Sequence, residues 1–72
     1  PRHVVVAGFG PVGRTLAERF VKRGVPVVII ELNPGTVRRQ SSMGRRIVYG
    51  DVTNPDVLES AGVREADAII LS

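Results

Sequence analysis

Apolar residues gather in four short runs along the chain, and polar segments with helical features separate these runs. Short apolar runs rich in valine and isoleucine are typical of strands that are buried on both faces of a parallel sheet. We therefore predict four strands. They cover residues 3–7 (HVVVA), 25–31 (VPVVIIE), 46–49 (RIVY) and 68–72 (AIILS).

Each segment between two runs contains a proline that suits the first turn of a helix, because its missing N–H would have no intrahelical acceptor there. The predicted helices cover residues 11–23, 34 to about 44, and 55–61. In the first of them the apolar residues form a single stripe at helical spacing. Asn33 and Asn54 precede the other two helices and suit their N-cap positions.

The strict alternation of strands and helices indicates an α/β fold with a parallel sheet and right-handed crossovers. With the first strand in the centre, we expect the strand order 3-2-1-4, a truncated Rossmann-like sheet with flanking helices. The fourth strand would lie at an open edge, which favours a fifth strand or another protomer beside it, and hence a homo-oligomer (dimer or larger). Because the chain starts at Pro1 and ends in an apolar run, we expect residues 1–72 to be a single unit, the N-terminal part of a longer domain.

Composition and charge argue against several kinds of site. The chain has no cysteine and one histidine, so we expect neither a disulfide framework nor a metal centre. Its ten basic residues outnumber its seven acidic residues, but they are spread over at least four segments without interleaved aromatic residues. That pattern favours a solvated basic surface over nucleic-acid binding. No apolar stretch reaches the ~20 residues of a membrane span, so we expect a soluble, cytoplasmic chain.

The segment from Gly8 to Gly13 carries three glycines with the spacing of a dinucleotide-binding loop, between a predicted strand and a predicted helix. In such loops the first glycine allows a tight turn, the second lets backbone approach a pyrophosphate, and the third lets helix and strand pack closely. Free N–H groups near Val12 and Gly13 would then face the phosphate. The alternative is that the glycines, Gly10 included, serve only the turn.

Glu31 ends the second predicted strand, where a carboxylate can accept hydrogen bonds from both ribose hydroxyls. It would repel a 2′-phosphate, which favours NAD or an adenosine nucleotide over NADP. The alternatives are an ordinary polar strand end, or a 2′-phosphate contact from Arg38 or Arg39, which we interpret as residues of a helix face.

Asp51 follows the third predicted strand, at the edge where open α/β sheets bind ligands. Its carboxylate could accept a hydrogen bond from an adenine amino group while Val52 packs against the ring. A role in forming a turn or capping a helix is an equal alternative.

No set of residues forms a catalytic pattern. His3 starts the first strand, at the end of the sheet opposite the glycine loop, and we interpret it as a strand-end residue. Tyr49 has no lysine nearby in the sequence, and the serines have neither a nucleophile elbow nor a histidine partner. These serines are Ser41, Ser42 and Ser60. We therefore predict that the chain is not an enzyme.

Three segments together resemble the RCK domain, also called KTN or TrkA-N: VVVAGFGPVGRTLAERF, PVVIIELNPGTVRR and IVYGDVTNPDVLESAGVREADAIILS. The more specific parts are Gly-Asp-x-Thr at 50–53 and Ala-Gly-Val at 61–63, followed by Ala-Asp at 66–67. This family regulates potassium channels, Trk and Ktr potassium uptake systems and Kef-like cation/proton antiporters. The chain departs from the family at Val52, where alanine is frequent, in the polar stretch QSSMGRR, and in lacking the family's fifth and sixth strands and any transporter segment.

The resemblance implies a regulatory domain, the cytoplasmic, soluble part of a membrane transport system, that binds NAD(H) or an adenine nucleotide (ATP, ADP or AMP). Its partners would be that nucleotide and a membrane transporter or channel domain. The implied cofactor-binding residues are Gly8, Phe9, Gly10, Pro11, Val12, Gly13, Glu31, Leu32, Asn33, Asp51 and Val52. Two alternatives stay open: the cofactor-binding half of an NAD-dependent dehydrogenase, and a fragment without nucleotide affinity.

Overall fold

The computed structural model describes residues 2–72, and Pro1 lies outside that range. In chain order the elements are β1 (Val4–Ala7), α1 (Pro11–Lys22), β2 (Val27–Glu31), α2 (Pro34–Ser42), β3 (Arg46–Tyr49), α3 (Pro55–Ser60), the 3₁₀ helix η1 (Val63–Glu65) and β4 (Ala68–Leu71). All four predicted strands and all three predicted helices are present, with ends that differ from the predicted ones by at most two residues. The helix η1 is the one element that the sequence pattern did not predict.

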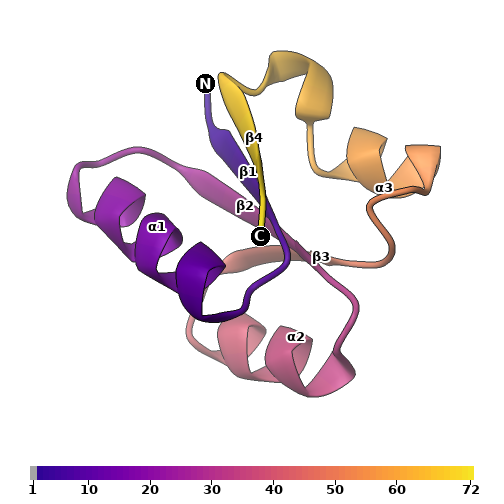
Figure 1. Cartoon of the computed structure of the whole chain (residues 1–72), viewed down its shortest axis with the longest axis horizontal. Coiled ribbons are helices and arrows are strands. Elements are labelled where there is room, and N and C mark those ends of the chain that lie inside the picture. Colours follow the sequence, from indigo (N-terminus) through magenta and orange to yellow (C-terminus); the bar gives the residue numbers. More distant parts are fainter. Residues whose placement is uncertain (1) are drawn as a thin grey trace.

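The four strands form one parallel sheet in the order β3-β2-β1-β4, so the predicted fold class and strand order are confirmed. Strand β1 lies in the interior of the sheet, where Val4 pairs with Val27 of β2 and with Ala68 of β4. Neighbouring parallel strands end at the same edge of a sheet, so the segments that follow the four strands lie close together (Figure 1).

Helices cover both faces of the sheet, with α1 and α2 on one side and α3 with η1 on the other (Figure 1). One apolar cluster joins Val6 of β1 to Ala17 of α1, and a second joins Val5 to Ala61 beyond α3. All four side chains are almost completely buried, as expected for a central parallel strand covered on both faces.

The three helices begin in two different ways. At α2, the Asn33 side chain accepts a hydrogen bond from Thr36 N at 3.0 Å, and at α3 the Asn54 side chain accepts one from Asp56 N at 2.9 Å. Both predicted N-caps are therefore confirmed. The N-cap of α1 is Gly10, which makes no side-chain cap, so the first N–H groups of α1 receive no acceptor from a cap residue.

The amino end of the sheet is closed by side-chain contacts. His3 is buried, and its Nε2 donates a hydrogen bond to the Ala61 carbonyl at 2.8 Å. Gly62 has φ +70°, and a Cβ there would lie 3.0 Å from the His3 ring. These contacts give the Ala61-Gly62-Val63 segment a structural role and leave His3 at the strand end, away from the glycine loop, as predicted.

Strand β4 forms one edge of the sheet and pairs with β1 alone within residues 2–72. Ile69 and Leu71 are 44% and 74% exposed, so apolar surface continues along this edge. A fifth strand or a second protomer at this edge stays a prediction. Among the described residues, no helix has the length and apolar content to cross a membrane.

Candidate functional site

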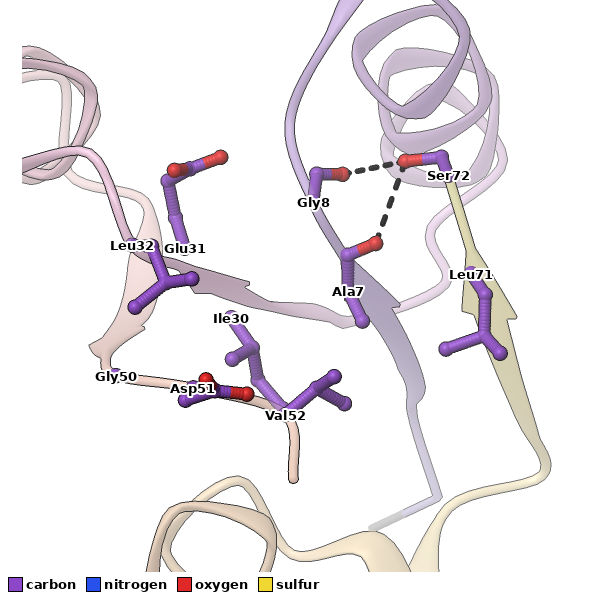
Figure 2. Close-up of a pocket in the computed structure, with 10 residues that line it drawn as sticks. All are labelled: Ala7, Gly8, Ile30, Glu31, Leu32, Gly50, Asp51, Val52, Leu71 and Ser72. Atoms are coloured by element: carbon purple, nitrogen blue, oxygen red, sulfur yellow. Dashed lines mark hydrogen bonds between the residues drawn. The ribbon is translucent and has the colours of Figure 1, made fainter. Parts of the chain in front are cut away.

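A cleft of about 320 Å³ lies at the carboxyl end of the sheet, where open α/β folds bind ligands (Figure 2). It is lined by Ala7, Gly8, Ile30, Glu31, Leu32, Gly50, Asp51, Val52, Leu71 and Ser72. Five of the residues predicted to bind a cofactor therefore share one cleft, although they come from three separate strand ends. These five are Gly8, Glu31, Leu32, Asp51 and Val52.

Two of the three loop glycines are required by the fold itself. Gly8 has φ +91°, and a Cβ at this position would overlap the Ser72 carbonyl group. A Cβ at Gly13 would overlap the Gly8 carbonyl and Ser72 Oγ. Larger residues are excluded at both positions whether or not a ligand binds.

Gly10 is different, because nothing in the protein requires a glycine there. Its φ of −77° is open to any residue, and a Cβ at this position would meet no atom within 4 Å. The missing side chain instead leaves free space in front of the α1 N-terminus. That space admits a group that must approach the backbone closely. In dinucleotide-binding loops this group is the pyrophosphate, which lies against the second glycine of the motif.

The charge at this end of α1 suits an anion. The helix dipole places partial positive charge at its N-terminus, and the first turn of α1 holds no acidic residue. Arg14 adds a full positive charge: it lines a depression beside the loop together with Phe9, Gly10, Pro11 and Thr15. Its guanidinium lies 5.7 Å from the centre of the Phe9 ring. Our sequence interpretation missed Arg14, although its place one residue after the third glycine was a usable signal.

The other predicted loop residues contribute backbone rather than side chains. Phe9 is 6% exposed, its side chain belongs to the apolar core, and its N–H binds Glu31. Pro11 has no N–H. Val12 is 65% exposed and lies outside the lining of the cleft, and its N–H is among the free groups at the start of α1.

The Glu31 carboxylate connects the glycine loop to the start of α2. One oxygen accepts a hydrogen bond from Phe9 N at 3.0 Å, and the other accepts one from Asn33 N at 2.5 Å. A carboxylate has about four acceptor positions, so acceptor capacity remains after these bonds. Glu31 therefore has a structural role and can still accept a hydrogen bond from a ribose hydroxyl.

Glu31 is held in its ionised form. Partial burial acts to raise its pKa, but hydrogen bonds from the backbone N–H groups of Asn33, Phe9 and Leu32 outweigh this effect and hold the pKa below its usual value. The charge that would accept a hydrogen bond from a ribose hydroxyl and repel a 2′-phosphate is thus present at neutral pH.

The two residues after Glu31 have different surroundings. Leu32 is 58% exposed and lines the cleft. The Asn33 side chain caps α2, and Asn33 is not among the lining residues. Its N–H binds Glu31, so Asn33 supports the site indirectly in this structure.

Asp51 lines the cleft but also forms a turn. Its Oδ1 accepts hydrogen bonds from Thr53 N at 2.8 Å and from Thr53 Oγ1 at 2.9 Å, and these bonds lower the Asp51 pKa. Asp51 therefore forms a turn, which was one of its two predicted roles. The backbone of Gly50, the residue before Asp51, lies close to the Val57 side chain, and a Cβ at Gly50 would overlap it.

Leu71 and Ser72 form a wall of the cleft that our sequence interpretation did not include. Ser72 Oγ donates a hydrogen bond to the Gly8 carbonyl at 2.6 Å, and Figure 2 shows Leu71 across the cleft from Leu32. The signal was available, because β1 and β4 were expected to be parallel neighbours, and such strands end side by side.

Within residues 2–72, no group of three or more histidine, cysteine, aspartate or glutamate residues is arranged to hold a metal ion. Tyr49 ends the edge strand β3 and is 60% exposed. Neither Tyr49 nor the serines named above lie among the residues that line the cleft.

Comparison with known proteins gives consistent matches over almost the whole chain. The sequence model of the TrkA-N domain matches residues 4–72. The glutathione-regulated potassium-efflux system protein KefC of Cronobacter sakazakii is 36% identical over 67 residues, and KefC of Salmonella arizonae has the same identity. These alignments cover 93% of this chain but 11% of each KefC protein, so the chain spans about a tenth of these relatives.

Two solved structures are similar in fold. The TrkA-N domain of the inner membrane protein ybaL from Escherichia coli superimposes with a TM-score of 0.93 at 30% identity, covering 97% of this chain and 52% of the other. The RCK domain of GsuK superimposes with a TM-score of 0.76 at 28% identity, covering 94% of this chain and 15% of the other.

Proposed function

Because the chain belongs to the TrkA-N domain family, we propose that it is a nucleotide-binding regulatory domain, the cytoplasmic part of a potassium or cation transport system. The observation that carries this proposal is the uncapped, unobstructed start of α1 at Gly10, close to an ionised Glu31 that also binds the loop. This combination has the shape and charge pattern that a phosphate and a ribose need.

In this proposal the cleft and the depression beside the glycine loop hold different parts of the nucleotide. The N–H groups at the start of α1 and the Arg14 guanidinium hold the phosphates. Glu31 accepts a hydrogen bond from a ribose hydroxyl, which favours NAD(H), ATP, ADP or AMP over NADP. Leu32, Val52 and Leu71 supply apolar surface for the adenine ring, and Asp51 Oδ2 is the acceptor for its amino group.

The regulatory step would be a shift between two arrangements of a larger assembly. A nucleotide changes such an equilibrium only if it binds one arrangement more tightly than the other. We propose a homo-oligomer of this domain, joined to a membrane transporter or channel domain, as the assembly that responds.

The chemistry of the cleft favours regulation over a dehydrogenase activity. A general acid or base works best with a pKa near the operating pH. The titratable residues of the cleft lining are Glu31 and Asp51, and hydrogen bonds hold the pKa of both carboxyl groups below their usual values. Both groups are therefore suited to accept hydrogen bonds rather than to exchange protons at neutral pH.

Calorimetric titration of the chain with NADH, NADPH, ATP and AMP tests the proposal. We expect NADH and the adenine nucleotides to bind more tightly than NADPH, and Glu31→Ala to weaken their binding at least tenfold, about the loss of one hydrogen bond at a charged group. Glu59→Ala is the matched control, because Glu59 is an exposed acid on α3 outside the cleft. Failure of every nucleotide to bind the folded chain, or tightest binding of NADPH, contradicts the proposal.

A further inference from the structure

The fold separates the charges of the chain into two layers. Residues 11–45, which include α1 and α2, contain seven of the ten basic residues and two of the seven acidic ones. Residues 50–67, which include α3 and η1 on the other face of the sheet, contain five acidic residues and one basic residue. The basic residues are scattered along the sequence, but the fold gathers them on one side.

The charges of the basic layer face solvent and are mostly unpaired. Five of these side chains form what we call the basic face: Arg19, Lys22, Arg23, Arg38 and Arg39, all exposed. Within residues 2–72 the ion pairs are Arg2 with Asp67 and Arg45 with Glu18, so no residue of the basic face is neutralised by an acidic neighbour. Glu31, the remaining acid of this half, is bound at the cleft.

Apolar side chains are interleaved with these charges. Val21 of α1 is 51% exposed and Met43, just beyond α2, is 65% exposed. Both line one depression of about 340 Å³ together with Arg45 and Arg46, which places apolar and basic residues side by side. Exposed apolar groups among flexible basic side chains are typical of surfaces that lie against the headgroup region of a membrane.

We propose that the basic face docks on an anionic lipid surface, so that the α1–α2 layer faces the membrane and the acidic α3 layer faces away. The inference rests on the proposed function, which places the chain next to a membrane. Charge complementarity carries it, because anionic leaflets attract clustered basic residues and repel acidic ones.

A lipid surface fits these residues better than a nucleic acid does. Single-stranded nucleic acids bind through exposed aromatic rings among basic residues. Phe9 is buried in the core on this side of the sheet and Phe20 is partly buried against the same cluster, so neither ring is free for stacking. Tyr49 is exposed, but it is a single ring at the carboxyl end of β3, whereas the exposed groups beside the basic residues are the aliphatic Val21 and Met43. Docking through this face leaves the nucleotide cleft open, because the cleft lies at the carboxyl edge of the sheet.

Sedimentation with lipid vesicles tests the proposal. The chain is mixed with vesicles of phosphatidylcholine alone, or of phosphatidylcholine with phosphatidylglycerol, at low and high salt. We expect binding only to the phosphatidylglycerol vesicles, with loss at high salt. The double variant Lys22→Gln with Arg38→Gln removes one charge from each helix, and we expect its partition coefficient to fall about 25-fold, about fivefold per charge.

The matched control lowers the net charge equally on the acidic layer, through Ser60→Glu with Arg64→Gln, both at exposed positions. We expect less than a threefold change in partition, about what weak long-range repulsion gives. Equal losses in both double variants, equal binding to both kinds of vesicle, or salt-sensitive self-association without vesicle binding would each overturn the docking proposal. Nucleotide titration of the same samples separates these outcomes from failure of the proposed function.

Discussion

The connection from β1 to α1 and the connection from β2 to α2 both place a proline at the first position of the helix, but they treat the free N–H groups differently. At α2 the Asn33 side chain accepts one of these N–H groups. At α1 the equivalent position is Gly10, which offers no side chain and leaves open space. The same local plan thus produces a closed helix start that stabilises the fold and an open one that is available to a ligand.

Glu31 joins these two connections. Its carboxylate bonds to Phe9 N in the open connection and to Asn33 N in the closed one. A ligand that competes for these oxygens would act on both helix starts at once. The site is therefore a pair of coupled loops rather than a single glycine motif.

The largest effect is expected from adding a side chain at Gly8, in the connection from β1 to α1, where neighbouring atoms leave no room for a Cβ. Gly8→Ala would combine a left-handed φ of +91° with an overlap against the Ser72 carbonyl. We expect the free energy of unfolding to fall by about 3 kcal/mol, from backbone strain and overpacking together. Denaturant unfolding measures it, and a loss below about 0.5 kcal/mol, the usual effect of a surface substitution, would show that the turn adapts.

A smaller effect is expected from removing the side-chain cap at the start of α2. Asn33→Gly removes the side-chain cap of α2 and makes this start resemble that of α1. The free energy of unfolding should fall by a few tenths of a kcal/mol, and Asn33→Ala should lower it by about 1 kcal/mol. Asn54→Ala at α3 is the parallel case, and thermal unfolding of all three variants checks whether the caps are equivalent.

The smallest effect is expected from the acid titration of Glu31. Its pKa is lowered in the folded chain, so its contribution to stability is present above the unfolded value of 4.5 and is lost as pH falls through the folded pKa. Glu31→Gln should therefore reduce the loss of stability below about pH 4.5. Denaturant unfolding of the unchanged chain and of Glu31→Gln, from neutral to acid pH, measures this difference. An equal loss of stability in both proteins would contradict the expectation.

Much of this comparison could be predicted from local sequence. The strands, the prolines and the asparagine caps act within a few residues, so the pattern was enough to find them. The carboxyl-edge position of Glu31 followed from strand order. The different roles of Gly8 and Gly10 could not be predicted, because they depend on whether Ser72, more than sixty residues away, fills the space beside each glycine.

Other features depended on tertiary placement in the same way. Leu71 joined the cleft only because β4 lies beside β1. The basic face was missed because its residues are far apart in the sequence, and only the right-handed crossovers bring α1 and α2 to one side of the sheet. The turn at Asp51 is an exception, because its bonds to Thr53 are local, and the sequence had already offered it as an equal alternative to a ligand contact.

The central claim is that the start of α1 is left open for a nucleotide phosphate, and Gly10→Asn tests it most directly. This change gives α1 the cap that α2 has, so we expect unchanged or slightly higher stability and at least a tenfold loss of affinity for NADH and ATP, as expected when about 1.4 kcal/mol of binding is removed. Ser41→Asn is the control, because Ser41 is exposed on α2 and lies outside both the cleft and the depression that Gly10 lines. Calorimetry showing unchanged nucleotide affinity in a folded Gly10→Asn variant would contradict the account.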